Sequence, residues 1–517
     1  MKNLKHSTWK NSKIFLLIGI ILSVSVSCSP QNNSNTDSER LENQRDFFEA
    51  NKEFKSKFES RIKNIFLDKQ LAGDFLLAVV NEKGLAYSYA LNREIINNEP
   101  NTLDNNSPIY VASHTKSFTG TLLKILEEEG KIDLSKSVYD YLPELTYGDD
   151  VDTKQIKVRQ LLNHTHGTNS NLFIWETAFL GYSGGNRKLI NDLNSYYKYD
   201  PSHIFRYSNT GPIIAAMIVE KVTGNSWKDE IKNRIFIPLK MRNSSCNVSD
   251  FRPEDIRPAV MVTNGGKIFQ SGFYKKDITM NAAGGIISTI NDLAKWLQAN
   301  INHDPILLKS DTSWKEMHEP TTDQDRTYFT YKRFGYSLGW DITDYRNDTL
   351  LTRFGGYAGI VFHISFLPSE KIGIISFSSD SRATSLTHLA ANYAYNLASQ
   401  IPEADSVFEK EKELFDESFE RNSNQPLPGK ENKLVECPEN DLLTGNYKNN
   451  SGWPDISIKK KESDYIMSWG MLNGSVYKIP DPSQPYIAAL GALERTFNVK
   501  GDSLFTGSLI YTKKREY

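Results

Sequence analysis

Hydrophobic residues recur at two different spacings along the chain, and the spacings predict where helices and strands lie. Over residues 48–71, apolar side chains recur every four residues from Phe54 to Phe66, as on one face of a helix. Residues 75–92 instead have the pattern of two strands joined by a turn at Gly84. We therefore expect the folded part of the chain to open with an amphipathic helix followed by a hairpin.

Helical and strand patterns then alternate up to about residue 401. One predicted helix follows Ser113 and ends at Gly130, and another begins near Pro212 and ends at Gly224. Apolar strand patterns come later, and the last predicted helix spans residues 383–401. The strands are predicted at residues 359–368 and 371–380.

The pattern changes in the last quarter of the chain. Residues 402–440 are rich in charge and then in Pro and Asn, which predicts a solvated helix followed by a linker. Residues 441–517 show short alternating runs separated by turn residues, which is typical of a small antiparallel β domain. We therefore divide the folded chain into a main domain at 48–401, a helix and linker at 402–440, and a β domain at 441–517.

The N-terminus is basic and then apolar, as in a secretory signal peptide. Lysines precede the apolar run 14–26, and Cys28 follows small residues. This resembles a bacterial lipoprotein signal, with residues 1–27 removed, Cys28 lipidated and residues 28–47 serving as a flexible tether. The alternative is an ordinary secretory signal with an incidental cysteine. The expected location is the bacterial cell envelope, with the protein anchored to the membrane by lipid and facing the periplasm or the cell exterior.

The net charge bears on the possible binding partners, and the cysteine content bears on possible disulfides. The formal net charge is -2 and neither sign dominates, so the overall charge gives no reason to expect nucleic acid as a partner. Besides Cys28, the chain contains only Cys246 and Cys437, which fall in different predicted domains. They could pair in an oxidising compartment, but we expect two isolated thiols.

The candidate chemistry begins at Ser113 and Lys116, which lie three residues apart at the start of a predicted helix. This spacing lets the lysine amine reach the serine hydroxyl, which is a weak nucleophile until a base takes its proton. The same spacing at Ser7, Ser60 and Ser457 lies in the signal, in mid-helix and on a strand. Only Ser113 combines it with a helix N-terminus, where the dipole stabilises negative charge.

A second weak motif is Tyr207-Ser208-Asn209, just ahead of the helix predicted near Pro212. Taken with the first motif, it resembles the serine β-lactamase and penicillin-binding protein superfamily, and most closely its branch of class C β-lactamases, D-Ala-D-Ala carboxypeptidases, D-aminopeptidases and related esterases. The resemblance covers roughly residues 70–400. It is carried in chain order by "YVASHTKSFTGTLLKILEEEGKIDLSKSVYDYLPEL", "IKVRQLLNHTHGT", "IFIPLKM", "NAAGGIISTINDLAKWL" and "FGYSLGW".

The resemblance implies an α+β fold: a β-lactamase/transpeptidase-like domain, with an antiparallel sheet flanked by helices plus an all-helical region, followed by a small antiparallel β-barrel. It also implies that Ser113 is the nucleophile, that Lys116 and Tyr207 shuttle its proton, and that Asn209 orients Lys116 and substrate. No cofactor is expected. The β-barrel is expected to cap or shape the substrate cleft.

The family's third motif departs from its usual form here. The family usually has Lys-Thr-Gly or His-x-Gly at this place. This chain has Arg353-Phe354-Gly355 instead. Arginine does not exchange its proton, but it supplies a fixed cation and can grip a substrate carboxylate. Gly355 and Gly356 leave room for substrate, and by family likeness the N–H groups of Ser113 and Gly356 form the oxyanion hole.

We therefore expect a serine hydrolase that forms an acyl-enzyme on an ester, a D-amino acid peptide or an amide. Two alternatives stay open: a weak or inactive penicillin-binding-like protein that binds cell-wall peptide, and a class C-type β-lactamase. His164 and His166 raise the idea of a metal site, but no third ligand has a suitable spacing, so no metal is expected. His114, inside the first motif, is expected to be a spacer rather than a base.

Overall fold

The computed structural model describes residues 51–92, 102–262, 268–270, 275–357, 359–424, 442–462, 464–491 and 493–514. The predicted signal peptide at 1–27, the tether and Cys28 lie outside the described residues, and so does Cys437. Their assignments stay predictions. Cys246 is a buried free thiol, and burial raises its pKa.

The centre of the main domain is a nine-stranded antiparallel sheet in the order β10-β11-β12-β13-β14-β15-β1-β2, with β9 paired to β11. Successive residues of β1 point to opposite faces, so that Leu76 joins one hydrophobic core and Leu77 the other. The sheet is therefore buried on both faces at its centre. The strands are β1 (Phe75–Asn81), β2 (Gly84–Leu91), β9 (Thr322–Asp323), β10 (Thr327–Tyr328), β11 (Tyr331–Tyr336), β12 (Asp341–Tyr345), β13 (Asp348–Tyr357), β14 (Ile360–Leu367) and β15 (Ile372–Ser378).

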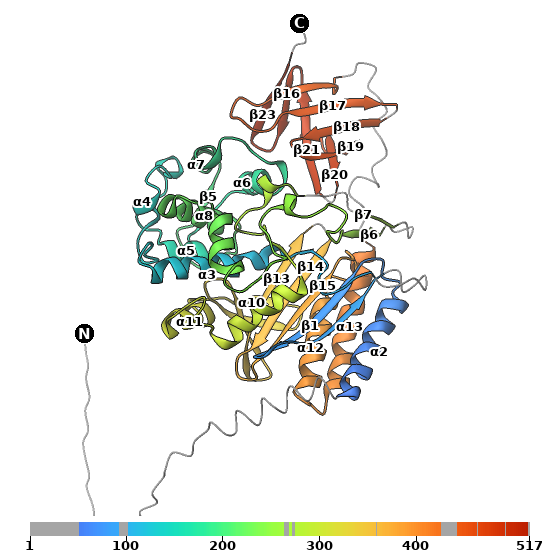
Figure 1. Cartoon of the computed structure of the whole chain (residues 1–517). Helices are drawn as coiled ribbons and strands as arrows, with labels where there is room; N and C mark the ends of the chain where they lie inside the picture. The colour runs from blue at the N-terminus through green and yellow to red at the C-terminus, as the bar shows by residue number, and fades with distance from the viewer. Residues whose placement is uncertain are drawn as a thin grey trace, which may run out of the picture. The chain divides into compact units, whose positions relative to one another are not determined.

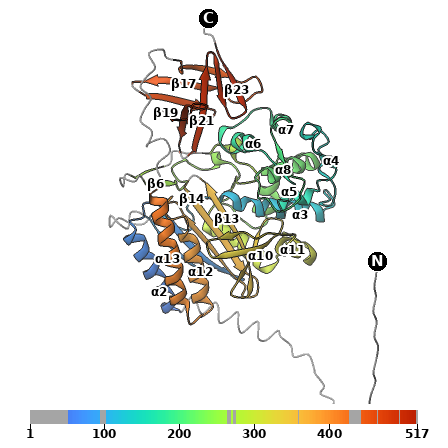
Figure 2. The ribbon, with the colours of Figure 1, turned by 180° about the vertical axis from the view of Figure 1, so that it is seen from behind.

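Three helices cover one face of this sheet: α2 (Lys52–Asp68), α12 (Leu386–Ala398) and α13 (Ala404–Ser423), as Figure 2 shows. The prediction of a solvated helix after residue 402 is wrong for one side of α13. Phe408, Phe415 and Phe419 are buried there in the same core as α2 and α12. These aromatic residues recur at helical spacing among many charges, so the charge count concealed an amphipathic helix that belongs to the main domain.

The opposite face carries α10 (Ile290–Asn302), α11 (Asp311–His318) and a helical region that holds the first predicted motifs (Figure 1). Within this region, η2 (Ala112–His114) leads directly into α3 (Thr115–Glu128), and α8 (Thr210–Thr223) ends at Gly224, whose left-handed conformation closes the helix. The other helices there are α4 (Val138–Tyr141), α5 (Val158–Leu162), α6 (Asn171–Trp175), η4 (Glu176–Leu180), α7 (Gly185–Ser195), α9 (Trp227–Ile231) and η5 (Lys232–Phe236).

Short elements connect these layers. Three two-stranded pairs join β3 (Ile109–Tyr110) to β8 (Ile287–Ser288), β4 (Thr168–Asn169) to β5 (Lys198–Tyr199), and β6 (Val260–Val262) to β7 (Ile268–Gln270). Single helical turns are η3 (Tyr147–Asp149), η6 (Val248–Asp250) and η7 (Asp277–Thr279). β3 lies just before η2 in the chain, and its pairing with β8 fixes the approach to Ser113.

The C-terminal β domain is a closed antiparallel barrel, which confirms the predicted fold class. Its core holds Trp469 and also takes in Leu172 and Leu180 from α6 and η4 of the main domain. The barrel strands are β16 (Gly445–Lys448), β17 (Ile456–Lys461), β18 (Asp464–Trp469), β19 (Leu472–Lys478), β20 (Tyr486–Leu490), β21 (Leu493–Lys500), β22 (Ser503–Thr506) and β23 (Leu509–Lys513).

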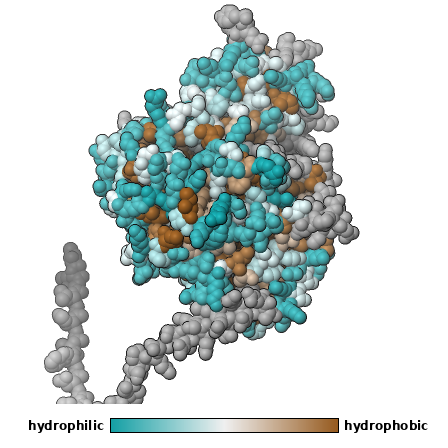
Figure 3. Space-filling model, in the orientation of Figure 1, coloured by the Kyte–Doolittle hydropathy of each residue, from teal (hydrophilic) through white to brown (hydrophobic). Residues whose placement is uncertain are grey.

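The surface seen in Figure 3 is mainly hydrophilic, with small, separate hydrophobic patches. Within the part of the chain that the structure describes, every helix is too short or too polar to cross a membrane.

Candidate active site

Ser113 lies at the point where a strained turn enters a helix. The preceding Ala112 has φ 46°, in the left-handed region that residues other than glycine rarely adopt. From Ser113 the chain continues into the buried helix α3, whose N-terminal amides carry partial positive charge. The turn therefore presents the hydroxyl at a helix end, as the sequence predicted.

Lys116 lies in the first turn of α3 and is almost completely buried. Its Nζ donates hydrogen bonds to Ser113 Oγ at 3.1 Å, to Asn209 Oδ1 at 2.7 Å and to the Ala283 backbone carbonyl at 2.7 Å. These contacts hold the amine against the serine hydroxyl. The geometry matches the orienting role that the resemblance implies for Asn209.

Tyr207 reaches the same hydroxyl from the other side. It lies in the loop before α8, and its hydroxyl donates to Ser113 Oγ at 2.9 Å. The ring also lies under the ammonium of Lys116, with Nζ 4.9 Å from the ring centroid. Ser113 Oγ is thus held between two groups that can each take a proton.

Arg353 on β13 completes the cluster. Its NH2 group donates to the Tyr207 hydroxyl at 2.7 Å, its NH1 group donates to Asp341 Oδ2 at 2.9 Å, and its Nε donates to the Ser113 carbonyl at 3.2 Å. All three guanidinium nitrogens therefore have partners in the protein. Arg353 is thus held in place as a fixed cation, and it is not among the residues that line the pocket beside Ser113.

The charges and the burial of this cluster bring the pKa values of Lys116 and Tyr207 close to each other. Burial lowers the pKa of Lys116 to about 8, and the nearby Tyr207 limits the decrease. Burial alone would raise the pKa of Tyr207, but the positive charges of Arg353 and Lys116 outweigh it and lower that pKa to about 8. Near neutral pH, the two groups can therefore exchange one proton through Ser113 Oγ at little cost.

The two glycines after Arg353 have different surroundings. A Cβ atom at Gly355 would lie 2.4 Å from the Val111 carbonyl oxygen and 3.2 Å from the Ser113 backbone nitrogen. At Gly356 the nearest such atom would be 3.9 Å away, and this residue lines the pocket beside Ser113. Gly355 thus allows β13 to approach the turn that carries the serine.

We expect Gly355→Ala to slow acylation of Ser113 by about 100-fold, because the added methyl would push the nucleophile turn away from β13 by a fraction of an ångström or more. The measurement is the rate of covalent labelling by a fluorophosphonate, with circular dichroism to check folding. Gly356→Ala is the matched control and should lose much less. Equal rates for the two variants would contradict this view of Gly355.

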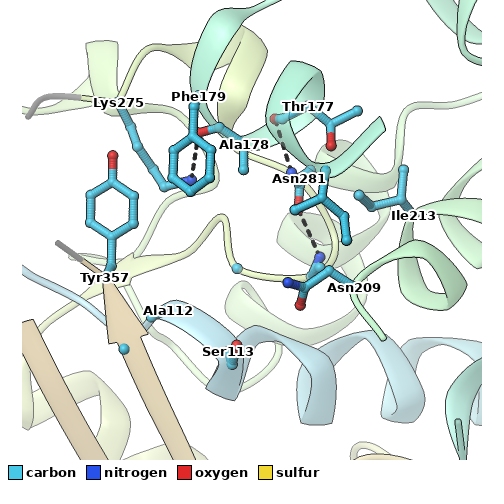
Figure 4. A pocket seen from close by; sticks show the side chains of 14 residues that line it. Ala112, Ser113, Thr177, Ala178, Phe179, Asn209, Ile213, Lys275, Asn281 and Tyr357 are labelled. Carbon is cyan, nitrogen blue, oxygen red and sulfur yellow. Dashed lines mark hydrogen bonds between the residues drawn. The ribbon is translucent and has the colours of Figure 1, made fainter. Parts of the chain in front are cut away.

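The pocket in front of Ser113 has a volume of about 90 Å³, and η4, β13 and residues 281–284 each contribute to its walls (Figure 4). One wall is fixed by Asn281, whose amide donates to the Thr177 carbonyl while its Oδ1 accepts from the Ala283 backbone nitrogen. Sequence reasoning missed Asn281, Ala283 and Asp341, and also missed Lys275. The pocket residues are Ala112, Ser113, Ile174, Thr177, Ala178, Phe179, Asn209, Ile213, Lys275, Asn281, Ala283, Gly284, Gly356 and Tyr357.

The histidines near the motifs have structural contacts. His114 is fully buried and accepts a hydrogen bond from Trp296 Nε1 at 3.0 Å, and burial lowers its pKa well below the usual value. His164 pairs with Tyr336, whereas His166 pairs with Thr168. In the described ranges, no group of three or more His, Cys, Asp or Glu residues could hold a metal ion.

Together, the fold and this cluster are those of the serine β-lactamase and penicillin-binding protein superfamily. The family model described as Beta-lactamase matches residues 54–397, about two thirds of the chain, and the chain therefore belongs to this family. Among curated relatives, it is 23% identical over 296 residues to "Unguisins hydrolase ungD'" of Aspergillus campestris, covering 54% of each chain. The chain thus spans about half the length of that relative.

Two solved structures resemble the fold over longer stretches. An octameric penicillin-binding protein homologue from Pyrococcus abyssi has a TM-score of 0.56 at 20% identity, covering 89% of this chain and 99% of that one. The D-amino acid amidase from Ochrobactrum anthropi, complexed with L-phenylalanine, has a TM-score of 0.52 at 22% identity, covering 63% and 91%. At these identities the likeness shows the fold alone.

Proposed function

We propose that the protein is a serine hydrolase that cleaves an ester, a D-amino acid peptide or an amide through an acyl-enzyme on Ser113. The observation that carries this proposal is the position of Ser113 Oγ, which is 3.1 Å from Lys116 Nζ and 2.9 Å from the Tyr207 hydroxyl in an accessible pocket. A serine held between two groups of matched pKa is prepared for removal of its proton. Membership in the family and the likeness to an amidase fold support the same reaction class.

The reaction runs in two halves. In the first, the Tyr207 phenolate takes the Ser113 proton while Oγ bonds to the substrate carbonyl carbon, and the carbonyl oxygen takes up the negative charge. The backbone N–H groups of Ser113 and Gly356 are assigned to stabilise that oxygen. As the bond to the leaving group breaks, Tyr207 passes the proton to it, which leaves an ester on Ser113.

Water then completes the cycle. Tyr207 takes a proton from the attacking water, the ester bond to Ser113 breaks, and the proton returns to Ser113 Oγ. Charged Lys116 stabilises the phenolate between these steps, and Arg353 does so throughout. Because Arg353 holds its proton at all relevant pH values, it acts only as a cation and transfers no proton.

The test is to locate a covalent adduct. We expect a fluorophosphonate to add one label per chain, and peptide mass mapping should place it on Ser113. A panel of p-nitrophenyl esters, D-amino acid amides and nitrocefin then separates the esterase, amidase and β-lactamase activities. Ser113→Ala is the control and should not be labelled. A folded protein that takes no label and hydrolyses nothing would instead be a binder without turnover.

A further inference from the structure

Lys275 faces the same pocket as Ser113 but belongs to none of the sequence motifs. It lies just before η7, and its side chain extends into the pocket between Tyr357 and Phe179 (Figure 4). Only 6% of the residue is exposed. Lysine is rarely buried to this degree without a partner of opposite charge.

The contacts of the Lys275 ammonium group leave its charge without a counter-ion. Nζ donates to the Thr279 carbonyl at 3.1 Å and more weakly to the Ala178 carbonyl at 3.4 Å, and it lies 4.7 Å from the centroid of the Tyr357 ring. Over the described residues, no Asp or Glu forms an ion pair with it. An ammonium group has three donors, so one of them is available for a ligand.

The surrounding charges are also unbalanced. Lys116 and Arg353 are further cations of this site. The carboxylate of Asp341 is already bound by Arg353 and by Arg333, and the Tyr207 oxygen, which can also carry negative charge, is bound by Arg353. None of the residues that line the pocket is Asp or Glu. Burial, with the charge of Lys116 added to it, lowers the pKa of Lys275 to about 7. A negatively charged ligand would restore the balance and favour the protonated amine.

We propose that Lys275 binds a carboxylate of the substrate, so that this hydrolase prefers esters or amides that carry a negative charge. The proposal rests on the proposed function and assigns the recognition of charge to Lys275, which lines the pocket, instead of Arg353, which does not. Apolar side chains on the same walls, such as Ile174 and Ile213, would enclose the uncharged part of the substrate.

The experiment compares three esters with similar leaving groups. Phenyl butyrate is neutral, monophenyl glutarate carries a carboxylate on its acyl part, and 4-(butyryloxy)benzoate carries one on its leaving group. The ratio of kcat/KM for each anionic ester to that for the neutral ester is measured in the native protein, Lys275→Met, Lys275→Arg and Lys276→Met. Lys276 is the matched control because it is the next residue and is exposed.

We expect Lys275→Met to lower the ratio by about tenfold or more for one of the two anionic esters, as for the loss of a hydrogen bond between charged groups. Lys275→Arg should keep part of the preference, and Lys276→Met should keep all of it. Equal losses on neutral and anionic esters would make Lys275 structural. An unchanged ratio in Lys275→Met would also overturn the proposal.

If the protein is not a serine hydrolase, a different measurement shows it. Fluorophosphonate labelling of Ser113 uses a neutral probe and reports that function alone. If no ester is hydrolysed, calorimetric titration of Ser113→Ala with monomethyl glutarate and with dimethyl glutarate decides the matter. Tighter binding of the anion that is lost on adding Lys275→Met supports recognition by Lys275, and equal or absent binding of the two refutes it.

Discussion

Replacing Tyr207 by phenylalanine should lower the acylation rate of Ser113 by about 10³-fold, which is within the range for removal of a general base. The substitution keeps the ring beside Lys116 and removes only the hydroxyl that lies 2.9 Å from Ser113 Oγ. Lys116 would still contact the serine at 3.1 Å, so a slow reaction should remain.

The pH profile gives this prediction a second readout. In the native protein, Lys116 and Tyr207 both have a pKa of about 8, and the competent state holds one proton between them. The rate should therefore rise as the first proton leaves and fall as the second leaves, with a maximum near pH 8. In Tyr207→Phe only Lys116 titrates, so the fall on the alkaline side should disappear.

Tyr336→Phe is the matched control for Tyr207→Phe. Tyr336 is also buried, and its ring also lies near Arg353, but its hydroxyl pairs with His164 instead of the serine. Burial raises its pKa, so it stays protonated over the measured range. Stopped-flow acylation rates between pH 6 and 10 provide the data. A bell-shaped profile that survives in Tyr207→Phe would remove Tyr207 from the mechanism.

Replacing Arg353 by methionine should reduce kcat/KM by about 10²- to 10³-fold, because it removes the fixed cation that lowers the pKa of Tyr207. The phenol would then hold its proton to a higher pH, so the rise in rate should move to the alkaline side. Lys116 alone would lower that pKa less. Arg353→Lys keeps the charge but loses the planar fork with three partners, and we expect an intermediate loss.

Arg333→Met separates the effect of charge from that of stability. Arg333 contacts the same carboxylate, Asp341, at 3.3 Å but does not contact Tyr207. Its loss should lower the melting temperature with little shift of the pH profile, whereas Arg353→Met should change both. The prediction for Arg353 fails if the two variants shift the profile by the same amount.

Much of the secondary structure could be predicted from the spacing of hydrophobic residues along the chain. The helix after Ser113 and the two apolar strand patterns near the end of the main domain are present as α3, β14 and β15. Closure of the barrel was harder to derive, because it depends on the pairing of β16 with β23 across the whole domain. Local alternation identifies strands, but it does not identify which strands meet over that distance.

In the candidate site, residues that lie in short motifs could be predicted from the sequence, whereas residues placed only by tertiary packing could not. Ser113, Lys116 and Tyr207 lie in short motifs, and the structure brings them together with Arg353. Lys275 had no such signal, since its sequence context is that of an ordinary lysine pair and its burial depends on packing between η7, η4 and β13. Contacts through backbone atoms, such as the carbonyl of Ala283, leave no trace in residue type.

The short helix η4 has the pocket on one side and the barrel on the other. Phe179 lines the pocket, whereas the carbonyl of the next residue, Leu180, accepts a hydrogen bond from Met471 in the turn between β18 and β19. Changes in that turn would thus move one wall of the pocket beside Ser113 and leave Lys116 and Tyr207 in place. Such a protein can acquire new substrates by mutation in a domain that takes no part in bond breaking.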